Sequence, residues 1–197
     1  MSKPAFTRQT AEARRRLLIE ATIVCLEKQG AAGLSVRNIA AMAGVSPGLL
    51  AHHFDGIEAL LAETYRDVAA RFAEIFQEAV RAAGKDAKAR LIAYLTASFI
   101  PEVCDAAIFS AWIAFWSFSK SSPAIAEAHR ELYAAYRREV ETLLAECGVK
   151  RKKLKMTAIA ATALVDGLWL ELCLDASVFS PQQARRQVER WILQELG

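Results

Sequence analysis

Glycine and proline are scarce in this sequence, which has nine glycines and five prolines among 197 residues. Because both residue types interrupt regular structure, their scarcity leaves long stretches in which a helix can continue. Apolar residues make up 54% of the chain, but they do not alternate with polar residues as in a half-buried strand. We therefore predict an all-α protein without a sheet.

Start and stop signals divide the chain into about nine helices. Predicted boundaries fall at glycines, prolines and capping residues, including Gly84, Pro101, Gly148 and the pair Ser180-Pro181. No internal repeat or low-complexity linker separates the helices. They are expected to cover residues 14–30, 36–43, 47–53, 58–83, 86–99, 104–118, 124–146, 150–175 and 182–196.

Cysteine and histidine are also few, with four cysteines and three histidines in the chain. The cysteines are far apart and form no C-x-x-C pair, so we expect reduced, buried thiols and neither a disulfide nor a zinc site. His52 and His53 are adjacent, which on a helix turns them about 100° apart, and His129 is distant in sequence. Because no glycine-rich phosphate loop or Ser-His-Asp order is present either, we predict no enzyme activity, no metal and no cofactor.

The net charge is small, at +3, so charge alone does not identify a partner. The apolar segment 156–174 follows a cluster of lysines and is long enough to be tested as a membrane span. Asp166 and Glu171 argue against a span, because an acidic side chain near the bilayer centre costs about 3 kcal/mol. The polar N-terminus also lacks the pattern of a signal peptide. We therefore expect a cytoplasmic protein without a membrane span.

Residues 34–61 have the pattern of two short helices joined by a tight turn. Ser35 is expected to cap the first helix, whose apolar residues recur with helical spacing, and Gly44 to end it. Ser46 and Pro47 are expected to begin the second helix. Two packed short helices of this kind bind DNA, with the second helix in the major groove. A plain helical hairpin inside an all-α protein is the alternative.

The second of these helices, 47–53, is predicted to bury only one side, through Leu50 and the following Phe54. The opposite side would face DNA, with Leu49 contacting a thymine methyl group and His52 or His53 donating to base edges. Because this side has no arginine or glutamine, we expect operator choice to depend on DNA shape and backbone as well. The predicted DNA-facing residues here are Ser46, Pro47, Gly48, Leu49, His52 and His53.

Together with the helices before and after them, these two helices resemble the DNA-binding domain of TetR-family repressors. The shared residues are Gly30, Ile39-Ala40, Ala43-Gly44-Val45-Ser46, Leu50, Phe54 and Leu60-Leu61. The resemblance implies a DNA-binding helix-turn-helix domain over residues 1–56 and a ligand-binding and dimerisation domain over residues 57–197. This chain has Ala51 and Ile57 where relatives usually have tyrosine and lysine, so those two phosphate contacts are not expected.

Basic residues outnumber acidic ones in residues 1–28, immediately before the predicted helix-turn-helix. The solvated face of an ordinary helix would explain this pattern, but its position beside a DNA-binding motif favours contacts with phosphate. Backbone N–H groups at helix starts also suit phosphate, because the helix dipole favours anions there. The predicted phosphate contacts come from Lys3, Arg8 and Arg37, and from the helix starts marked by Ser35, Val36 and Ser46.

Aromatic residues cluster in segment 109–120, where Trp112, Phe115 and Trp116 recur with the spacing of one helical face. Asp166 similarly lies three residues before Trp169. Aromatic faces attract organic cations, with about 0.5–2 kcal/mol per good contact, and a nearby carboxylate adds Coulomb attraction. An ordinary aromatic core is the alternative interpretation. The residues predicted to bind a ligand are Phe99, Trp112, Phe115, Trp116, Asp166 and Trp169.

Segments 110–117, 163–172 and 183–196 resemble the C-terminal half of the BetI type of TetR-family repressors, which respond to choline. The resemblance implies a double-stranded DNA operator and a choline-like cation as partners. An apolar effector in the same cavity is the rival within the family. A helical module that binds a small molecule without binding DNA is the rival outside it.

The last two predicted helices carry apolar residues on more than one side. Surplus apolar surface of this kind suits a twofold interface resembling a four-helix bundle. Two recognition helices related by a twofold axis would contact half-sites about 34–36 Å apart. We therefore predict a homodimeric repressor on a pseudo-palindromic operator, released when a ligand moves the helix over 58–83. The predicted interface residues are Leu168, Leu172, Trp191 and Ile192.

Overall fold

The computed structural model describes residues 11–196, which form nine α-helices and two short 3-10 helices without a strand. The all-α prediction is confirmed, and the predicted helix boundaries are correct to within a few residues. The elements are α1 (Ala11–Gln29), η1 (Ala31–Gly33), α2 (Val36–Met42), α3 (Pro47–His53), α4 (Gly56–Ala82), α5 (Ala87–Thr96), η2 (Ala97–Phe99), α6 (Ala106–Phe118), α7 (Pro123–Glu146), α8 (Arg151–Leu174) and α9 (Pro181–Leu196).

Capping residues set several helix starts. The carboxylate of Asp86 accepts a hydrogen bond from the Ala89 N–H at 2.7 Å, and that of Asp105 accepts one from the Ala107 N–H at 2.9 Å. These bonds satisfy backbone donors that have no partner inside the helix. Pro123 occupies the first turn of α7, where its missing N–H costs nothing. Short-range interactions of this kind therefore fix the starts of α5, α6 and α7.

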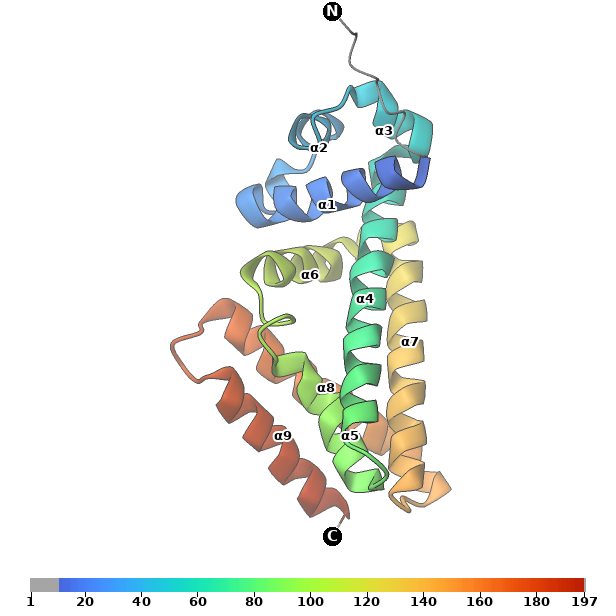
Figure 1. The fold of residues 1–197 in the computed structure, drawn as a ribbon, viewed down its shortest axis with the longest axis vertical. Helices are drawn as coiled ribbons and strands as arrows, with labels where there is room; N and C mark the ends of the chain where they lie inside the picture. The colour runs from blue at the N-terminus through green and yellow to red at the C-terminus, as the bar shows by residue number, and fades with distance from the viewer. Residues whose placement is uncertain (1–10, 197) are drawn as a thin grey trace, which may run out of the picture.

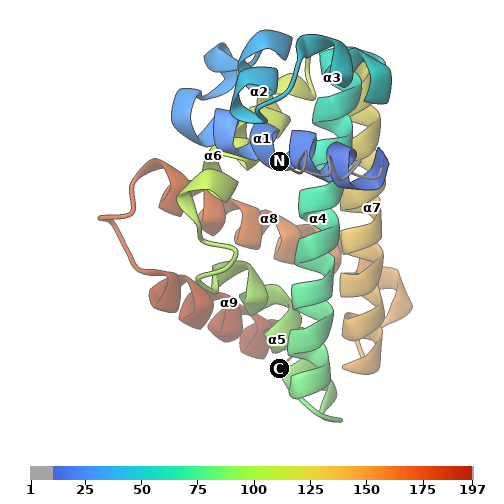
Figure 2. The same ribbon diagram turned by 45° about the horizontal axis from the view of Figure 1, so that its top comes forward.

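Helices α4 and α7 lie side by side and run in the same direction (Figure 1). Near their starts the Ser122 hydroxyl donates to the Glu58 carboxylate at 2.6 Å, and farther along the Gln77 amide donates to Glu139 at 3.0 Å. Helices α1, α2 and α3 gather at the start of α4, whereas α5, α8 and α9 lie toward its end (Figures 1 and 2). Helix α6 lies between these two groups and packs against α1.

Two clusters of buried side chains form the core. The larger one extends from α1 to α9 and includes the cavity walls described below. The smaller one surrounds Tyr65 of α4, which is fully buried among Leu26 of α1, Phe115 of α6 and Ile125 of α7. Helix α4 contributes to both clusters, so it connects the first three helices to the rest of the molecule. The boundary predicted at residues 56/57 falls at the start of α4 and stays a prediction.

Helix α8 is, within residues 11–196, the one helix long and apolar enough to cross a membrane by length and composition. A core helix passes the same test, and α8 packs on α7 and α9. Part of its surface is nevertheless exposed, including Met156 and Ile159. The four cysteines are free thiols, of which Cys25 is buried. The other three are only half-buried, so the prediction of buried thiols is correct for one of the four.

Candidate DNA interface and effector cavity

Helices α2 and α3 form the predicted helix-turn-helix. The Ser35 hydroxyl accepts a hydrogen bond from the Asn38 N–H at 3.1 Å, which caps α2. Gly44 ends the helix with a φ of +65°, a left-handed conformation that favours glycine. Ile39 of α2 and Leu50 of α3 are fully buried and belong to the same core cluster. Both short helices therefore have the boundaries and the buried side that the sequence predicts.

The outward side of α3 is exposed at Pro47, Gly48, Ala51 and His52, whereas Leu49 is half-buried. Ser46 has the extended backbone of a capping residue, but its hydroxyl makes no capping hydrogen bond. The prediction that this hydroxyl caps α3 is therefore wrong, and proline at the first helical position begins the helix without it.

His53 differs from the prediction that it faces outward. It is half-buried, and its Nε2 atom is buried without a hydrogen-bond partner. Burial and the nearby His52, Arg14 and Arg15 lower the pKa of His53, which favours the neutral ring. A buried Nε2 cannot donate to a base edge, so His52 is the histidine left on the outward side.

Arg15 of α1 has a role that the sequence analysis missed. Its guanidinium donates to the His53 carbonyl at 2.8 Å, lies 3.5 Å from the Glu63 carboxylate and stacks 4.5 Å from the centre of the Phe54 ring. These contacts join α1, the end of α3 and α4 through one planar donor group. No local pattern announces this role, because the partners are distant in sequence.

The predicted phosphate contacts are distributed unevenly. Arg37 is exposed on α2, beside the helix start at Ser35, while the half-buried Val36 side chain packs against the core. Lys3 and Arg8 lie outside the described residues.

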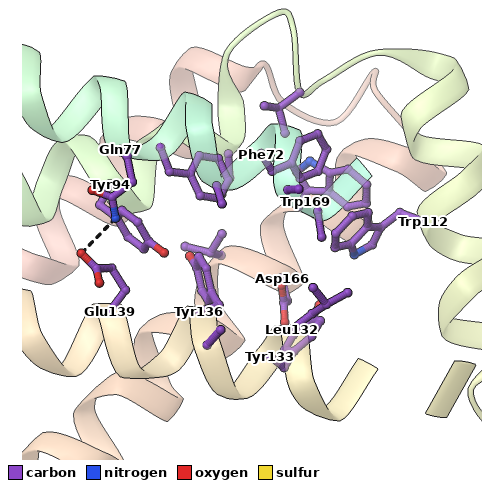
Figure 3. Close-up of a pocket in the computed structure, with 18 of the residues that line it drawn as sticks. Phe72, Gln77, Tyr94, Trp112, Leu132, Tyr133, Tyr136, Glu139, Asp166 and Trp169 are labelled. Carbon is purple, nitrogen blue, oxygen red and sulfur yellow. Dashed lines mark hydrogen bonds between the residues drawn. The ribbon is translucent and has the colours of Figure 1, made fainter. Parts of the chain in front are cut away.

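A cavity of about 360 Å³ lies between α4, α5, α6, α7 and α8 (Figure 3). This volume is within the range of about 300–1,000 Å³ common for small-molecule sites. Its walls are mainly aromatic rings with alanines between them. The cavity is lined by Arg66, Ala69, Ala70, Phe72, Ala73, Phe76, Gln77, Tyr94, Ser98, Val103, Trp112, Leu132, Tyr133, Ala135, Tyr136, Glu139, Val165, Asp166 and Trp169.

The aromatic rings support one another in a continuous wall. Trp112 stacks on Phe72 with ring centres 5.1 Å apart and meets Trp169 edge-on at 6.1 Å. At the other end Tyr94 stacks on Tyr136 at 5.4 Å. Aromatic pairs at these separations stabilise one another, which fixes ring orientation before a ligand arrives. The cavity therefore offers several π-faces at once.

Asp166 of α8 lies at the Trp112 end of the cavity (Figure 3). Burial raises the pKa of its carboxyl to about 6, although a hydrogen bond from the Tyr133 hydroxyl and the charge of Arg137 favour ionisation. The Trp116 indole donates to the Tyr133 oxygen at 3.0 Å. Because an indole N–H only donates and a hydroxyl has one proton, Tyr133 is left to donate to Asp166.

The opposite end of the cavity has its own polar groups. Gln77 donates to Glu139 at 3.0 Å, beside Tyr94 (Figure 3). Burial, with a smaller contribution from Glu139, raises the pKa of Tyr94. The Tyr136 hydroxyl is buried toward Ser98 and lacks a hydrogen-bond partner of good geometry.

Three of the six predicted ligand-binding residues line the cavity: Trp112, Asp166 and Trp169. The other three do not. Phe115 is fully buried and stacks on Tyr65, and Phe99 is buried in η2. The Trp116 indole donates a hydrogen bond to the lining residue Tyr133. Lining residues that were not predicted from the sequence are Phe72 and Phe76 on α4, Tyr94 on α5, and Tyr133, Tyr136 and Glu139 on α7. Spacings of three and four residues on α4 and α7 are the signals that could have found most of them.

Two residues that line the cavity also contact Tyr65 and His129, and Tyr65 belongs to the core cluster that includes Leu26 of α1. Tyr65 meets Trp112 edge-on with ring centres 5.1 Å apart, and its hydroxyl lies 3.0 Å from His129 Nδ1. The His129 ring lies 4.3 Å from that of Tyr133. Both Trp112 and Tyr133 line the cavity, so two of its walls adjoin the buried junction of α4, α6 and α7.

The predicted dimer residues divide into two groups. Leu172 and Ile192 are 3% and 1% exposed and belong to the core of their own chain, so their assignment to a subunit interface is wrong. Leu168 and Trp191 are half-buried. All the exposed large hydrophobic side chains in the described part lie on α8, on α9 or between them; they are Met156, Ile159, Leu174, Val178 and Leu193.

Comparison with known proteins agrees with this architecture. Residues 18–64 match the family of bacterial regulatory proteins called the tetR family, and residues 87–197 match the BetI-type transcriptional repressor C-terminal family. An HTH-type transcriptional regulator BetI from Cronobacter sakazakii is 31% identical over 187 residues, which are 93% of this chain and 91% of that protein.

Solved structures of regulators share the fold. One from Pseudomonas aeruginosa PAO1 has a TM-score of 0.88 and 40% identity, covering 98% of this chain and 95% of that one. A regulator from Saccharomonospora viridis, solved in complex with choline, has a TM-score of 0.78 at 20% identity, covering 93% of this chain and 96% of that one.

The exposed recognition helix and the separate helical domain define a helix-turn-helix transcriptional regulator. More specifically, the chain belongs to the TetR family, and its C-terminal half is of the BetI type. Members of this family bind DNA and repress transcription.

Proposed function

We propose that this regulator binds a pseudo-palindromic operator as a homodimer and releases it when a small organic cation, choline or a related one, occupies the aromatic cavity. One observation carries the effector: Asp166 is a half-buried carboxylate among aromatic rings, and desolvation raises the pKa of its carboxyl. Desolvation penalises its charge, and a cation in the cavity would offset that penalty. The choline bound to the Saccharomonospora viridis regulator supports the same class of effector.

The test of this proposal compares choline with its uncharged carbon analogue, 3,3-dimethylbutan-1-ol. The two molecules have nearly the same shape, so they differ in the charge that Asp166 and the aromatic faces would recognise. We expect choline to bind at least tenfold more tightly in calorimetry and to weaken operator binding in a gel shift. An apolar effector is the competing candidate, favoured by the mainly apolar walls; equal binding of the two molecules would support it.

Base contacts are proposed for the exposed side of α3. Leu49 lies one turn from the exposed His52, which allows an apolar contact and a donor at neighbouring base pairs. Leu49→Ala and His52→Ala are each expected to weaken operator binding by about 1–3 kcal/mol, measured by fluorescence anisotropy. The circular dichroism spectrum should not change, since neither side chain belongs to the core. Ala145→Ser, an exposed change on α7, serves as control, and wild-type affinity in both variants would place the base contacts elsewhere.

Coupling between cavity and DNA would run through α4 and α6. Both helices line the cavity, and both also pack on α1. A ligand that displaces Trp112 or Phe72 would therefore shift the helices that support the helix-turn-helix. Release of the operator about 5- to 150-fold requires coupling of about 1–3 kcal/mol. Operator affinity with and without saturating choline measures this coupling directly.

The exposed apolar surface of α8 and α9 is proposed as the subunit interface. On α8, Met156, Ile159, Ala163 and Leu174 are exposed with the spacing of one helical face. Pairing of two such surfaces would give an antiparallel or crossed four-helix arrangement with twofold symmetry. The predicted interface residues Leu168 and Trp191 are half-buried in the single chain.

A further inference from the structure

The cavity contains a second carboxylate. Glu139 of α7 lines the end beside Tyr94 and Gln77, whereas Asp166 lines the end beside Trp112 and Tyr133 (Figure 3). Tyr136 and Phe72 lie between them. A single small cation placed against Asp166 would leave Glu139 with the hydrogen bond from Gln77 but without a cationic partner. Carboxylates at both ends of the cavity therefore suit a ligand with two polar ends.

The charges of the cavity walls are unbalanced. Within residues 11–196, neither Asp166 nor Glu139 forms an ion pair with a lysine or arginine. Arg66, the basic residue of the lining, is already paired with Glu63 at 3.2 Å and Glu131 at 3.1 Å. Arg137 influences Asp166 but stacks against the Tyr133 ring and does not line the cavity. The lining thus presents two acidic groups whose charges a ligand would have to balance.

A polar group between the two ends is also incompletely hydrogen-bonded. The Tyr136 hydroxyl is buried and has no hydrogen bond of good geometry. Buried polar groups normally have a partner, and leaving one unpaired costs about 1–3 kcal/mol. A ligand extending from Asp166 toward Glu139 would pass this hydroxyl and the faces of Phe72 and Tyr94, which line the same space.

From these observations we infer that the effector is an elongated organic dication, a diamine or bis-quaternary ammonium compound, with one cationic group at Asp166 and the other at Glu139. This inference rests on the proposed function, because it assumes that the cavity is the effector site. The inference goes beyond the proposed function by assigning a second charged subsite. The apolar middle of such a ligand would lie against the aromatic walls, and each cationic group would lie beside one half-buried carboxylate.

The test measures calorimetric binding of two matched probe series to the full-length protein. One series is α,ω-bis(trimethylammonium)alkanes of increasing chain length, and the other is alkyltrimethylammonium ions of the same lengths. At one length the dication is expected to bind at least tenfold more tightly than the matched monocation. In Glu139→Gln that advantage should disappear while monocation affinity stays unchanged. The glutamine keeps the shape and can still accept the hydrogen bond from Gln77. Glu141→Gln, on the same helix but outside the lining, is the matched control.

The possible outcomes separate this inference from the proposed function. If the dication and the monocation bind equally, or if Glu139→Gln leaves the dication advantage intact, the second subsite is wrong and a monocation effector stands. If neither series binds but a neutral apolar probe does, both the inference and the cation effector fail. If the advantage is lost in Glu139→Gln and retained in Glu141→Gln, the second subsite is established.

Discussion

Asp166→Asn is expected to weaken cation binding about 30-fold or more while making the unliganded protein more stable. The loss of affinity follows from removing one partner of a buried charge pair, which costs about 2 kcal/mol or more. The gain in stability comes from removing the desolvation cost of the same carboxylate in the unliganded protein. Burial raises the pKa of Asp166 from 3.8 to about 6, so folding at pH 7 carries the cost of an ionised buried carboxylate. That cost is about 1–3 kcal/mol, and asparagine removes it while keeping the hydrogen bond from Tyr133.

The effect of Asp166 on stability and on cation affinity should depend on pH. In the wild type the carboxyl binds its proton more tightly in the folded than in the unfolded state, so the cost is absent below about pH 4 and complete above about pH 6. The variant should therefore melt about 3–10 °C higher at pH 7, with the difference closing toward pH 4. Wild-type affinity for choline should fall as the pH drops through 6. Glu74→Gln, an exposed change on α4, should alter neither property. Unchanged melting together with unchanged affinity would contradict the role given to Asp166.

Ala163→Glu is expected to convert the regulator to monomers and to weaken operator binding about 10²–10⁴-fold. Ala163 is exposed on the apolar face of α8 in the single chain. A twofold axis would bring two such glutamates into the same interface, where each charge loses water without gaining a partner. The large loss of operator affinity follows because a monomer contacts one half-site and loses the gain from linking two. Sedimentation velocity measures the first effect and fluorescence anisotropy the second.

The matched control is Ala145→Glu, the same substitution at an exposed position on α7. It should leave the dimer and the operator affinity unchanged. Both variants should keep the helical circular dichroism spectrum, because neither alanine is buried. A dimer of wild-type affinity in Ala163→Glu would show that the subunits meet through another surface.

The helix boundaries could be predicted because they depend on local chemistry. Gly44 ends α2 and Pro47 begins α3 through backbone preferences that act within a few residues. The buried side of the recognition helix was equally predictable, since Leu50 and Phe54 lie one turn apart and are 1% and 5% exposed. Such features require no knowledge of what packs against them.

The cavity was predictable only in part, because its walls come from five helices. Trp169 could be recognised as an aromatic residue near Asp166, and Trp112 as part of an aromatic helical face. Phe115 belongs to the same predicted face as Trp112, but it packs on Tyr65 instead. Periodicity identifies a face of a helix and does not distinguish a face on a cavity from a face on the core. The contribution of Tyr94 and Glu139 depends on how α5 and α7 are placed in space. For the same reason Leu172 and Ile192 look like interface residues in the sequence and are core residues in the fold.

The contacts of Arg15 have a mechanical consequence. Since this side chain binds the end of α3 and also Glu63 of α4, the recognition helix is tied to the first turns of α4. Helix α4 has 27 residues, and about 24 Å of it separates Phe72 from its first residue. A tilt of about 5° at the cavity would displace the far end by about 2 Å. The helix would then act as a lever arm. A small movement around a ligand would change the spacing between the two recognition helices, so that they no longer fit both half-sites of one duplex.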